Sequence, residues 1–204
     1  MPEASVNAIR LKRVLLLLPV LVLVALVSSW FWGDLQQAKA ALPSLTLETL
    51  DGKPYPLSAS PGKTRLVELI YTRCPDVCPT TTFKMVQLQK RLTDAGVMGK
   101  NVEFLTITID PLNDTADVLQ RYADQLQIQT QGWTILRGDE STIQSVTRSL
   151  GFVARKSADG FISHTTSTYL VNASNEVIRT FGMGDDFNTD LIYQELVSKN
   201  KEGL

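Results

Sequence analysis

The chain lacks the positive charge that a nucleic-acid-binding protein needs. Its 204 residues carry 20 Lys and Arg against 21 Asp and Glu, a formal net charge of -1, and the body of the chain holds no Lys/Arg-rich run. Because phosphate binding depends on clustered positive charge, nucleic acid is not expected as a partner. Internal repeats and low-complexity segments are also absent. The length is sufficient for one ordinary hydrophobic core and one membrane segment.

Side chains that bind soft metals are equally scarce, with two cysteines and one histidine in the whole chain. Cys74 and Cys78 lie in the stretch Thr72–Pro79, and His164 lies far downstream. Two thiolates and one imidazole suit copper or zinc, whereas two thiols alone suit redox chemistry. The question of function therefore depends largely on these three side chains.

Charge is absent from the segment Val14–Trp32, which as a helix spans roughly 28 Å, close to the roughly 30 Å of a bilayer's hydrocarbon core. Arg10, Lys12 and Arg13 precede it, so the positive-inside rule puts the N-terminus in the cytoplasm. We therefore expect four consecutive parts: a cytoplasmic N-terminus (1–13), a single-pass transmembrane anchor in a bacterial-type inner membrane (14–32), a tether (33–43) and an exported, periplasmic domain (44–204).

A cleaved signal peptide is the competing interpretation, since Ala38-Lys39-Ala40 has the form of a cleavage site. The apolar segment is longer than a usual signal-peptide core, and the candidate site lies well beyond its end, so the uncleaved anchor is favoured. In both cases the body is exported to a compartment where disulfides persist. A cysteine pair there can be oxidised unless another factor keeps it reduced.

Hydrophobic periodicity predicts alternating strands and helices in the exported domain. A short hairpin around the Asp51-Gly52 turn comes first. An apolar strand over 65–71 then leads directly into Cys74, and Pro79 fits the first turn of a helix that runs to Gly96. The remaining predicted elements are a strand over 102–109, a helix capped by Asp114, a strand over 133–136, a helix over 140–150, strands over 166–171 and 176–181, and a helix over 188–199.

This order of elements is the order of the thioredoxin-like fold, an α/β fold in which helices flank a mixed central sheet. The strands over 65–71 and 102–109 are expected to be parallel and joined by a right-handed crossover, with the C-terminal strand pair as the antiparallel half. General thiol oxidoreductases of this fold carry Cys-x-x-Cys and a proline facing it. Here the cysteine spacing is longer, no proline follows Pro111, and the neighbourhood of His164 takes the corresponding place. This difference favours a metal-binding protein over a general thiol oxidoreductase.

The spacing of the cysteines permits two states. Two side chains four residues apart on a helix have Cβ atoms roughly 5 to 6 Å apart, which a metal bridges easily, and a modest adjustment closes a disulfide. With His164 beside the Cys loop, the expected site holds Cu(I) through the thiolates of Cys74 and Cys78 and Cu(II) with the imidazole added. The alternative is a structural disulfide and an uninvolved histidine, although a disulfide closing so short a loop would stabilise little.

The segment Tyr71–Thr80, with the sequence Tyr-Thr-Arg-Cys-Pro-Asp-Val-Cys-Pro-Thr, resembles the signature of the Sco/SenC copper proteins. Two further blocks resemble the same family in the same order, namely Thr106–Pro111 with Asp114, and His164 followed by Tyr169–Val171. The resemblance covers the whole exported domain from Ser44 onward.

This resemblance implies a membrane-tethered, thioredoxin-like protein that binds copper through Cys74, Cys78 and His164. It further implies a metallochaperone that assists assembly of the copper A centre of cytochrome c oxidase by delivering copper, by reducing the acceptor cysteines, or both. The implied partners are cytochrome c oxidase subunit II and an upstream copper donor. The alternative is a thiol-disulfide reductase, an enzyme in which Cys74 attacks and Cys78 resolves.

One departure from the family concerns the residue before the histidine. The family often has an acidic residue there, whereas this chain has Ser163, and a carboxylate at that position can orient the imidazole and raise its basicity. Asp110 and Asp114 match the family's acidic block. Strand termination and helix capping explain these two residues without a functional role, so neither is included among the candidate site residues.

Overall fold

The computed structural model describes residues 40–58 and 62–202. The predicted cytoplasmic N-terminus and anchor (1–32), and most of the predicted tether, lie outside these residues. Among the described helices, none combines the length and the apolar character needed to cross a bilayer. From Ala40 onward the chain forms one compact unit.

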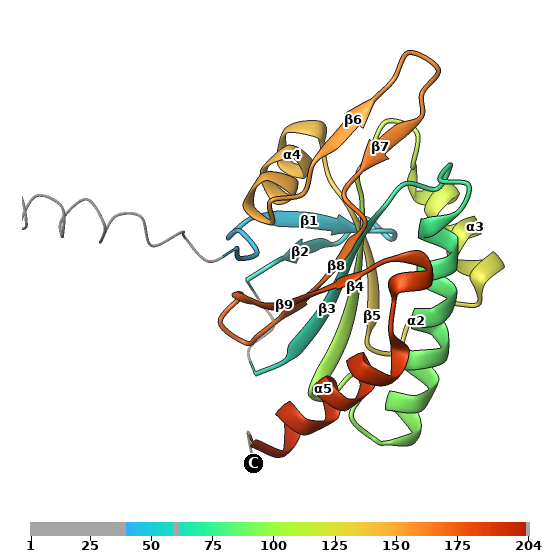
Figure 1. Cartoon of the computed structure of the whole chain (residues 1–204). Coiled ribbons are helices and arrows are strands. Elements are labelled where there is room, and N and C mark those ends of the chain that lie inside the picture. The colour runs from blue at the N-terminus through green and yellow to red at the C-terminus, as the bar shows by residue number, and fades with distance from the viewer. Residues whose placement is uncertain (1–39, 59–61, 203–204) are drawn as a thin grey trace, which may run out of the picture. The chain divides into compact units, whose positions relative to one another are not determined.

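A seven-stranded mixed sheet forms the centre of this unit, with the strand order β2-β1-β5-β4-β3-β8-β9 (Figure 1). Its strands are β1 (Thr46–Thr49), β2 (Pro54–Pro56), β3 (Thr64–Ile70), β4 (Val102–Thr108), β5 (Trp133–Arg137), β8 (Ser167–Val171) and β9 (Val177–Gly182). Strands β3, β4 and β5 are parallel, whereas β8 runs antiparallel to β3. The predicted parallel pair and the predicted antiparallel C-terminal half are therefore confirmed.

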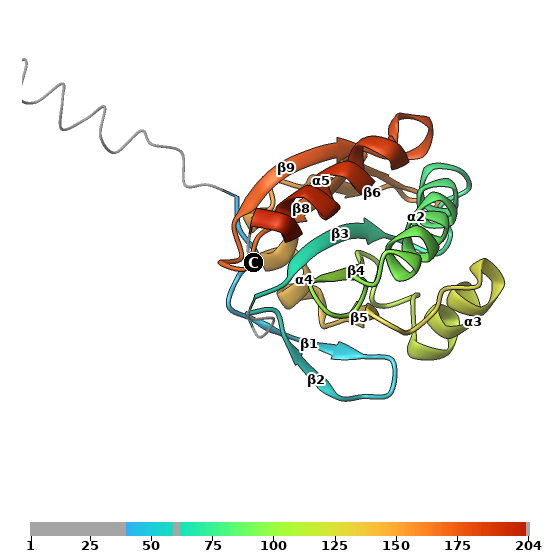
Figure 2. The same cartoon turned by 90° about the horizontal axis from the view of Figure 1, so that it is seen from below.

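Helices cover both faces of the sheet, as Figure 2 shows from below. On one face lie α2 (Val77–Asp94), α3 (Ala116–Leu126) and α5 (Thr189–Glu202), and on the other lies α4 (Glu140–Ser149). The alternation of β3 explains this layering, because Leu66 packs with α2 and α5 while Val67 packs with α4. A short 3-10 helix, η1 (Gly184–Asp186), connects β9 to α5.

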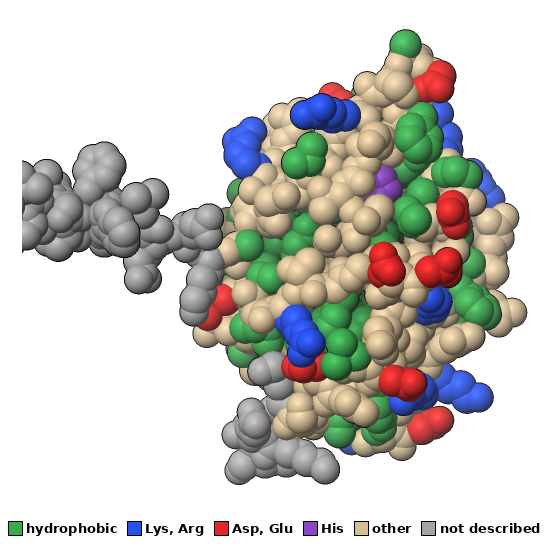
Figure 3. Space-filling view, in the orientation of Figure 1, with side chains coloured by type: hydrophobic (Ala, Val, Ile, Leu, Met, Phe, Trp, Pro, Cys, Tyr) green, Lys and Arg blue, Asp and Glu red, His purple; other side chains and the backbone are tan. Residues whose placement is uncertain are grey.

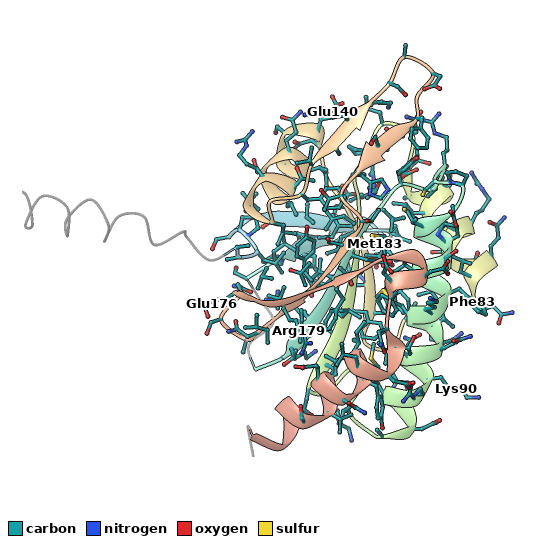
Figure 4. All side chains as sticks on the ribbon, in the orientation of Figure 1. Phe83, Lys90, Glu140, Glu176, Arg179 and Met183 are labelled. Carbon is teal, nitrogen blue, oxygen red and sulfur yellow. The ribbon has the colours of Figure 1, made fainter. Side chains whose placement is uncertain are left out.

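Helix α2 is the element that positions the cysteine motif. Its buried residues Met85, Leu88 and Leu92 recur at helical spacing and pack on the sheet. The opposite side of the helix faces solvent, where Figure 4 shows the labelled side chains of Phe83 and Lys90 pointing away from the sheet. The amphipathic pattern therefore fixes how the N-terminal turn of α2, with Cys78, faces the sheet.

A second, two-stranded sheet is not among the predicted elements. It consists of β6 (Ala154–Lys156) and β7 (Ile162–His164), paired antiparallel, and Figure 1 shows it extending beyond α4. Each strand has three residues and β6 is exposed throughout, so no apolar alternation marks either one. His164 is the last residue of β7 and, as expected, lies just before the next strand, β8, which begins at Ser167.

Candidate metal centre

The loop that carries Cys74 begins where β3 ends. The backbone N–H of Cys74 donates to the carbonyl oxygen of Tyr71 at 3.0 Å, and α2 begins at Val77, so Cys78 lies in the first helical turn. Asp76 is the N-cap residue, but its side chain makes no capping hydrogen bond. The backbone N–H groups of Asp76 and Cys78, at the start of the helix, instead favour the charged form of Cys74 and help to lower its pKa. The helix N-terminus therefore stabilises a thiolate at Cys74.

The structure brings the three predicted site residues together. Nε2 of His164 lies 3.8 Å from Sγ of Cys78, and the ligand atoms of Cys74, Cys78 and His164 all lie within 4.8 Å of one another. In the described part of the chain, this is the one group of three His, Cys, Asp or Glu residues close enough to hold a metal ion. Side chains separated by 86 positions in sequence thus form a single S, S, N set.

The other imidazole nitrogen of His164 has a partner that fixes the ring. Nδ1 lies 2.8 Å from the carbonyl oxygen of Thr165, and a carbonyl oxygen can only accept, so Nδ1 carries the proton. In the neutral ring this leaves the lone pair on Nε2, which faces the sulfurs. Ser163 is exposed, and the Thr165 carbonyl provides the kind of orienting contact that a carboxylate at position 163 could give.

Aromatic rings enclose the histidine. Phe152 stacks on the imidazole with centroids 5.6 Å apart, and Tyr71 meets it edge-on at 5.7 Å. Cys78 is fully buried and Cys74 is 8% exposed, whereas His164 is half-buried. Figure 3 shows the imidazole at the surface, bordered by hydrophobic side chains. Solvent and partners can therefore reach the site along the imidazole edge, while the sulfurs are shielded.

The two cysteines differ in acidity. The Cys78 thiol, together with His164 and the helix N–H groups, stabilises the thiolate of Cys74 and lowers its pKa to about 4, although burial opposes this. The same interaction with Cys74, together with burial, raises the pKa of Cys78. His164 has a raised pKa, because its contact with the Cys74 thiolate outweighs burial. In the metal-free site, Cys74 therefore loses its proton more easily than Cys78.

This arrangement supports two kinds of chemistry. Two sulfurs bound to one metal ion, each at about 2.3 Å, lie at most about 4.6 Å apart, so the observed separations need little contraction to hold a metal. Both cysteines are free, and the low pKa of Cys74 also suits nucleophilic attack on a disulfide. The donor set fits soft and borderline metals.

Asp114 holds the Cys loop. Its fully buried carboxylate accepts hydrogen bonds from the backbone N–H of Thr72 at 3.1 Å, from the Thr72 hydroxyl at 2.5 Å and from the Thr108 hydroxyl at 2.5 Å. The prediction that Asp114 caps the next helix is wrong, because the N-cap of α3 is Thr115, whose hydroxyl oxygen accepts from the N–H of Val118. The carboxylate joins the ends of β3 and β4 instead.

Asp110 connects the Cys loop to the hairpin that carries the histidine. Asp110 is buried, with only 3% of the residue exposed. Its carboxylate pairs with Arg73 at 3.0 Å and with Lys156 on β6 at 2.8 Å. Asn113 adds hydrogen bonds at 2.9 Å, and Arg73 also donates to the carbonyl oxygen of Gly160 at 3.4 Å. Burial opposes ionisation of Asp110, but the hydrogen bonds from Lys156, Asn113 and Arg73 outweigh it and lower the pKa.

Asp110 and Asp114 are therefore positioning residues, although neither is among the predicted site residues. One signal could have identified them. Parallel strands end at the same edge of a sheet, so residues that follow the strand over 102–109 are expected beside the loop that follows the strand over 65–71. Two buried carboxylates at that edge need partners, and the Cys loop provides backbone and side-chain donors.

Comparison with known proteins places the chain in a family. A model of the SCO1/SenC family matches residues 33–199. The chain belongs to the SCO1/SenC family. This confirms the resemblance to the Sco/SenC proteins that the three sequence blocks indicate.

Individual relatives agree with this membership. A SCO1 protein homolog from Bacillus subtilis is 26% identical over 156 residues, which are 75% of this chain and 79% of that protein. The copper-bound structure of ScoI from Bradyrhizobium japonicum is 26% identical, with a TM-score of 0.65, over 81% of this chain and 100% of that one. The structure of BsSco, a Sco-family cytochrome c oxidase assembly protein in which a disulfide switch is identified, is 25% identical, with a TM-score of 0.69, over 79% and 94%. The predicted α/β, thioredoxin-like architecture of the described domain is thereby confirmed.

Proposed function

We propose that this SCO1/SenC family member binds copper through Cys74, Cys78 and His164 and assists maturation of the copper A centre of cytochrome c oxidase. The observation that carries the proposal is the convergence of two sulfurs and one imidazole nitrogen within 4.8 Å of one another. Two relatives support it, one with copper bound and the other a member of the cytochrome c oxidase assembly proteins.

Copper is the cargo of this proposed site. Cu(I) prefers the two thiolates, and Cu(II) takes the imidazole nitrogen in addition. Cys74 offers a thiolate at neutral pH, whereas Cys78 loses its proton as the metal binds. The half-buried edge of His164 is where an acceptor protein can approach, because the sulfurs lie deeper.

The proposed location is the periplasmic side of a bacterial-type inner membrane, with residues 14–32 as the anchor. The support is the charge-free segment and the basic residues that precede it. The proposed partners there are a copper donor and cytochrome c oxidase subunit II.

A fusion of alkaline phosphatase to the C-terminus tests the proposed topology. Alkaline phosphatase is active only after export, so the fusion is expected to be active. An intact but inactive fusion would contradict the proposed topology.

A copper titration tests the proposed function. The reduced full chain is titrated with Cu(I) in competition with a chelator of known affinity, and separately with Cu(II). One tight equivalent is expected for the wild type. Replacing either sulfur, in Cys74→Ser or Cys78→Ser, is expected to lower Cu(I) affinity by more than about a hundredfold, and His164→Ala is expected to weaken Cu(II) more than Cu(I).

The matched control is Met98→Leu. It removes a buried sulfur next to the start of β4, at the end of the sheet opposite the Cys loop, and is expected to leave both affinities unchanged. A wild type without a tight one-to-one site, or a Cys74→Ser chain that binds copper as well as the wild type, would rule the proposal out.

A second candidate function is thiol-disulfide reduction of the acceptor's cysteines. The low pKa of Cys74 beside a second free cysteine favours it. Cys74 would attack the acceptor disulfide, and Cys78 would then displace the reduced acceptor and leave a Cys74–Cys78 disulfide. This exchange needs no copper and is expected to survive His164→Ala, which separates it from copper delivery.

A further inference from the structure

A cleft of about 510 Å³ lies between α4 and the β6–β7 hairpin. The buried apolar side chains of Ile143, Phe152 and Ile162 line its inner wall. Its volume falls in the range of roughly 300 to 1,000 Å³ that is common for binding sites. Figure 1 shows that β6, rather than β7, is the hairpin strand next to α4. The cleft is therefore bounded by a helix on one side and by the outer strand of a hairpin on the other.

The outer edge of β6 presents backbone groups that no strand uses. The N–H of Thr165 on the β7 side donates to the carbonyl oxygen of Val153, and the antiparallel ladder alternates, so Val153 and Arg155 direct their backbone groups at β7. The N–H and C=O groups of Ala154 and Lys156 therefore point away from β7. None of these groups has a hydrogen bond with any residue that the structure describes.

Such an edge is suited to the addition of a third strand. The β6–β7 sheet has two strands and pairs with no strand of the main sheet. Two-stranded hairpins are marginally stable by themselves, and an exposed edge pairs readily with an extended segment of another chain. Main-chain hydrogen bonds then provide affinity, and the side chains that enter the cleft provide specificity.

The charges of α4 indicate which side chains the cleft accepts. Glu140 and Arg148 both line it, both are exposed, and neither forms an ion pair or a side-chain hydrogen bond within the described part of the chain. Asp110 and Lys156 also line the cleft, but these two pair with each other at 2.8 Å. Glu140 and Arg148 are eight residues apart on one helix, which is about 12 Å along its axis. Two residues four positions apart on one strand are separated by a similar distance, about 13 Å.

A second copy of the chain is a poor occupant of this edge. If β6 paired with β6 of another copy, Arg155 and Lys156 of one copy would lie close to the same two residues of the other. Like charges on neighbouring strands destabilise the pairing. A different chain, with charges complementary to Glu140 and Arg148, fits better.

We propose that this cleft binds an extended segment of a partner protein, which adds a third strand beside β6. The segment places a basic side chain at Glu140, an acidic side chain at Arg148 four positions away, and an apolar side chain between them. Phe152 lines the cleft and also stacks on the imidazole of His164, so the segment is held next to the metal centre. The partner is therefore the protein that approaches that centre, and this identification alone rests on the proposed function.

A seven-residue peptide, Thr-Glu-Thr-Val-Thr-Lys-Thr, is the probe for the charge pattern, because its acidic, apolar and basic side chains lie on one face of a strand. Fluorescence anisotropy of the labelled peptide measures its affinity for the full chain, and a matched neutral peptide has Gln in place of both charged residues. Arg148→Gln is expected to weaken binding of the charged peptide about fivefold and to leave binding of the neutral peptide unchanged.

A proline substitution tests the strand pairing. Ala154→Pro removes an N–H that points away from β7, so it is expected to leave the hairpin paired and to weaken both peptides more than tenfold. The control is Ala158→Pro in the hairpin turn, which the N–H of Gly160 closes by donating to the carbonyl oxygen of Ser157. Proline is favoured at the second position of such a turn, so peptide binding is expected to be unchanged.

Amide hydrogen exchange locates the bound peptide. Saturating charged peptide is expected to slow exchange at Ala154 and Lys156 of the wild type more than at Arg155, whose N–H already faces β7. Exchange of the β7 amides in the two proline variants checks that the hairpin is still formed.

Three results would overturn the inference: a wild type that does not bind the charged peptide, equal peptide affinities in Ala154→Pro and Ala158→Pro, or a wild-type dimer in ultracentrifugation that Ala154→Pro dissociates. The dimer would assign the edge of β6 to a second copy. The copper titration is independent of these measurements. A chain that binds the peptide but lacks a tight copper site would uphold the cleft and refute the proposed function, whereas tight copper binding without peptide binding would refute this inference alone.

Discussion

At the scale of single residues, Glu68 in β3 is the most unusual buried group. Its carboxylate is fully buried and accepts hydrogen bonds from the hydroxyls of Thr106 at 2.7 Å and Thr82 at 3.2 Å. Tyr122 bonds to Thr82 at 2.8 Å, and the indole N–H of Trp133 donates to Thr106 at 2.9 Å, so two chains of neutral donors end on one carboxyl. Burial outweighs these bonds and raises the pKa of Glu68 to about 7.

This raised pKa predicts a pH-dependent stability. Between the ordinary pKa of 4.5 and about 7, the unfolded chain loses the Glu68 proton while the folded chain keeps it, so stability falls as pH rises through that window. Relative to Glu68→Gln, the wild type is expected to lose about 2 to 3 kcal/mol of unfolding free energy from pH 4.5 to pH 7. Urea denaturation across this range measures the difference.

The control for that series is Glu140→Gln, which changes an exposed carboxyl at the start of α4 (Figure 4). It is expected to follow the pH profile of the wild type. Parallel profiles for wild type and Glu68→Gln would show that the folded chain does not hold the Glu68 proton in this window.

At the scale of elements, the β6–β7 hairpin completes the site. It carries His164 but pairs with no strand of the main sheet. Its ties to the Cys loop include the carboxylate of Asp110, which contacts both Arg73 and Lys156, the hydrogen bond from Arg73 to the Gly160 carbonyl, and the rings around the imidazole. The distance between the sulfurs and the imidazole therefore depends on interactions between elements rather than on strand pairing.

Asp110→Asn tests this connection. The substitution keeps the shape of the side chain but removes the charge that Arg73 and Lys156 share, and is expected to cost about 1 to 3 kcal/mol because the carboxylate is buried. Relative to the wild type, the variant is expected to show faster hydrogen exchange, and the increase is expected to be larger in residues 154–164 than in β3 or β4. Asp190→Asn, which removes an exposed ion pair with Arg91, is the control and should change exchange in the hairpin very little. Unchanged protection of residues 154–164 in Asp110→Asn would contradict the connection.

The same hairpin is the part of the fold that the sequence does not predict. Strands β3 and β4 are predictable because each is a long apolar run, and α2 because Pro79 and an amphipathic stripe define it. Strands β6 and β7 are too short for any periodicity, although the turn dipeptide Asp159-Gly160 between them was an available signal. The three candidate ligands were identifiable because so few residues in the chain can bind soft metal. The contacts of Asp110 and Asp114 with the Cys loop were not, although the shared edge of parallel strands places both residues beside that loop.

At the scale of the whole molecule, pairing between strands that are distant in sequence determines where each element lies in the sheet. Hydrophobic periodicity predicts the elements but not these positions. The N-terminal hairpin is predictable, but its position at the sheet edge follows from the pairing of β1 with β5, in which Glu48 lies opposite Arg137. The described chain begins at the end of the sheet opposite the site, where the carbonyl oxygen of Ala40 accepts from the N–H of Val177. The Cys loop follows Ile70 at the other end of β3 and is clear of this N-terminal segment.

The central claim, that one copper ion is held by two sulfurs and one imidazole, is tested most directly by X-ray absorption at the copper edge on the full chain loaded with one equivalent of copper. We expect two sulfur neighbours in the Cu(I) and Cu(II) forms, an imidazole nitrogen in the Cu(II) form, and loss of that imidazole in His164→Ala. A copper environment of oxygen and nitrogen without sulfur, or an imidazole signal that persists in His164→Ala, would contradict it.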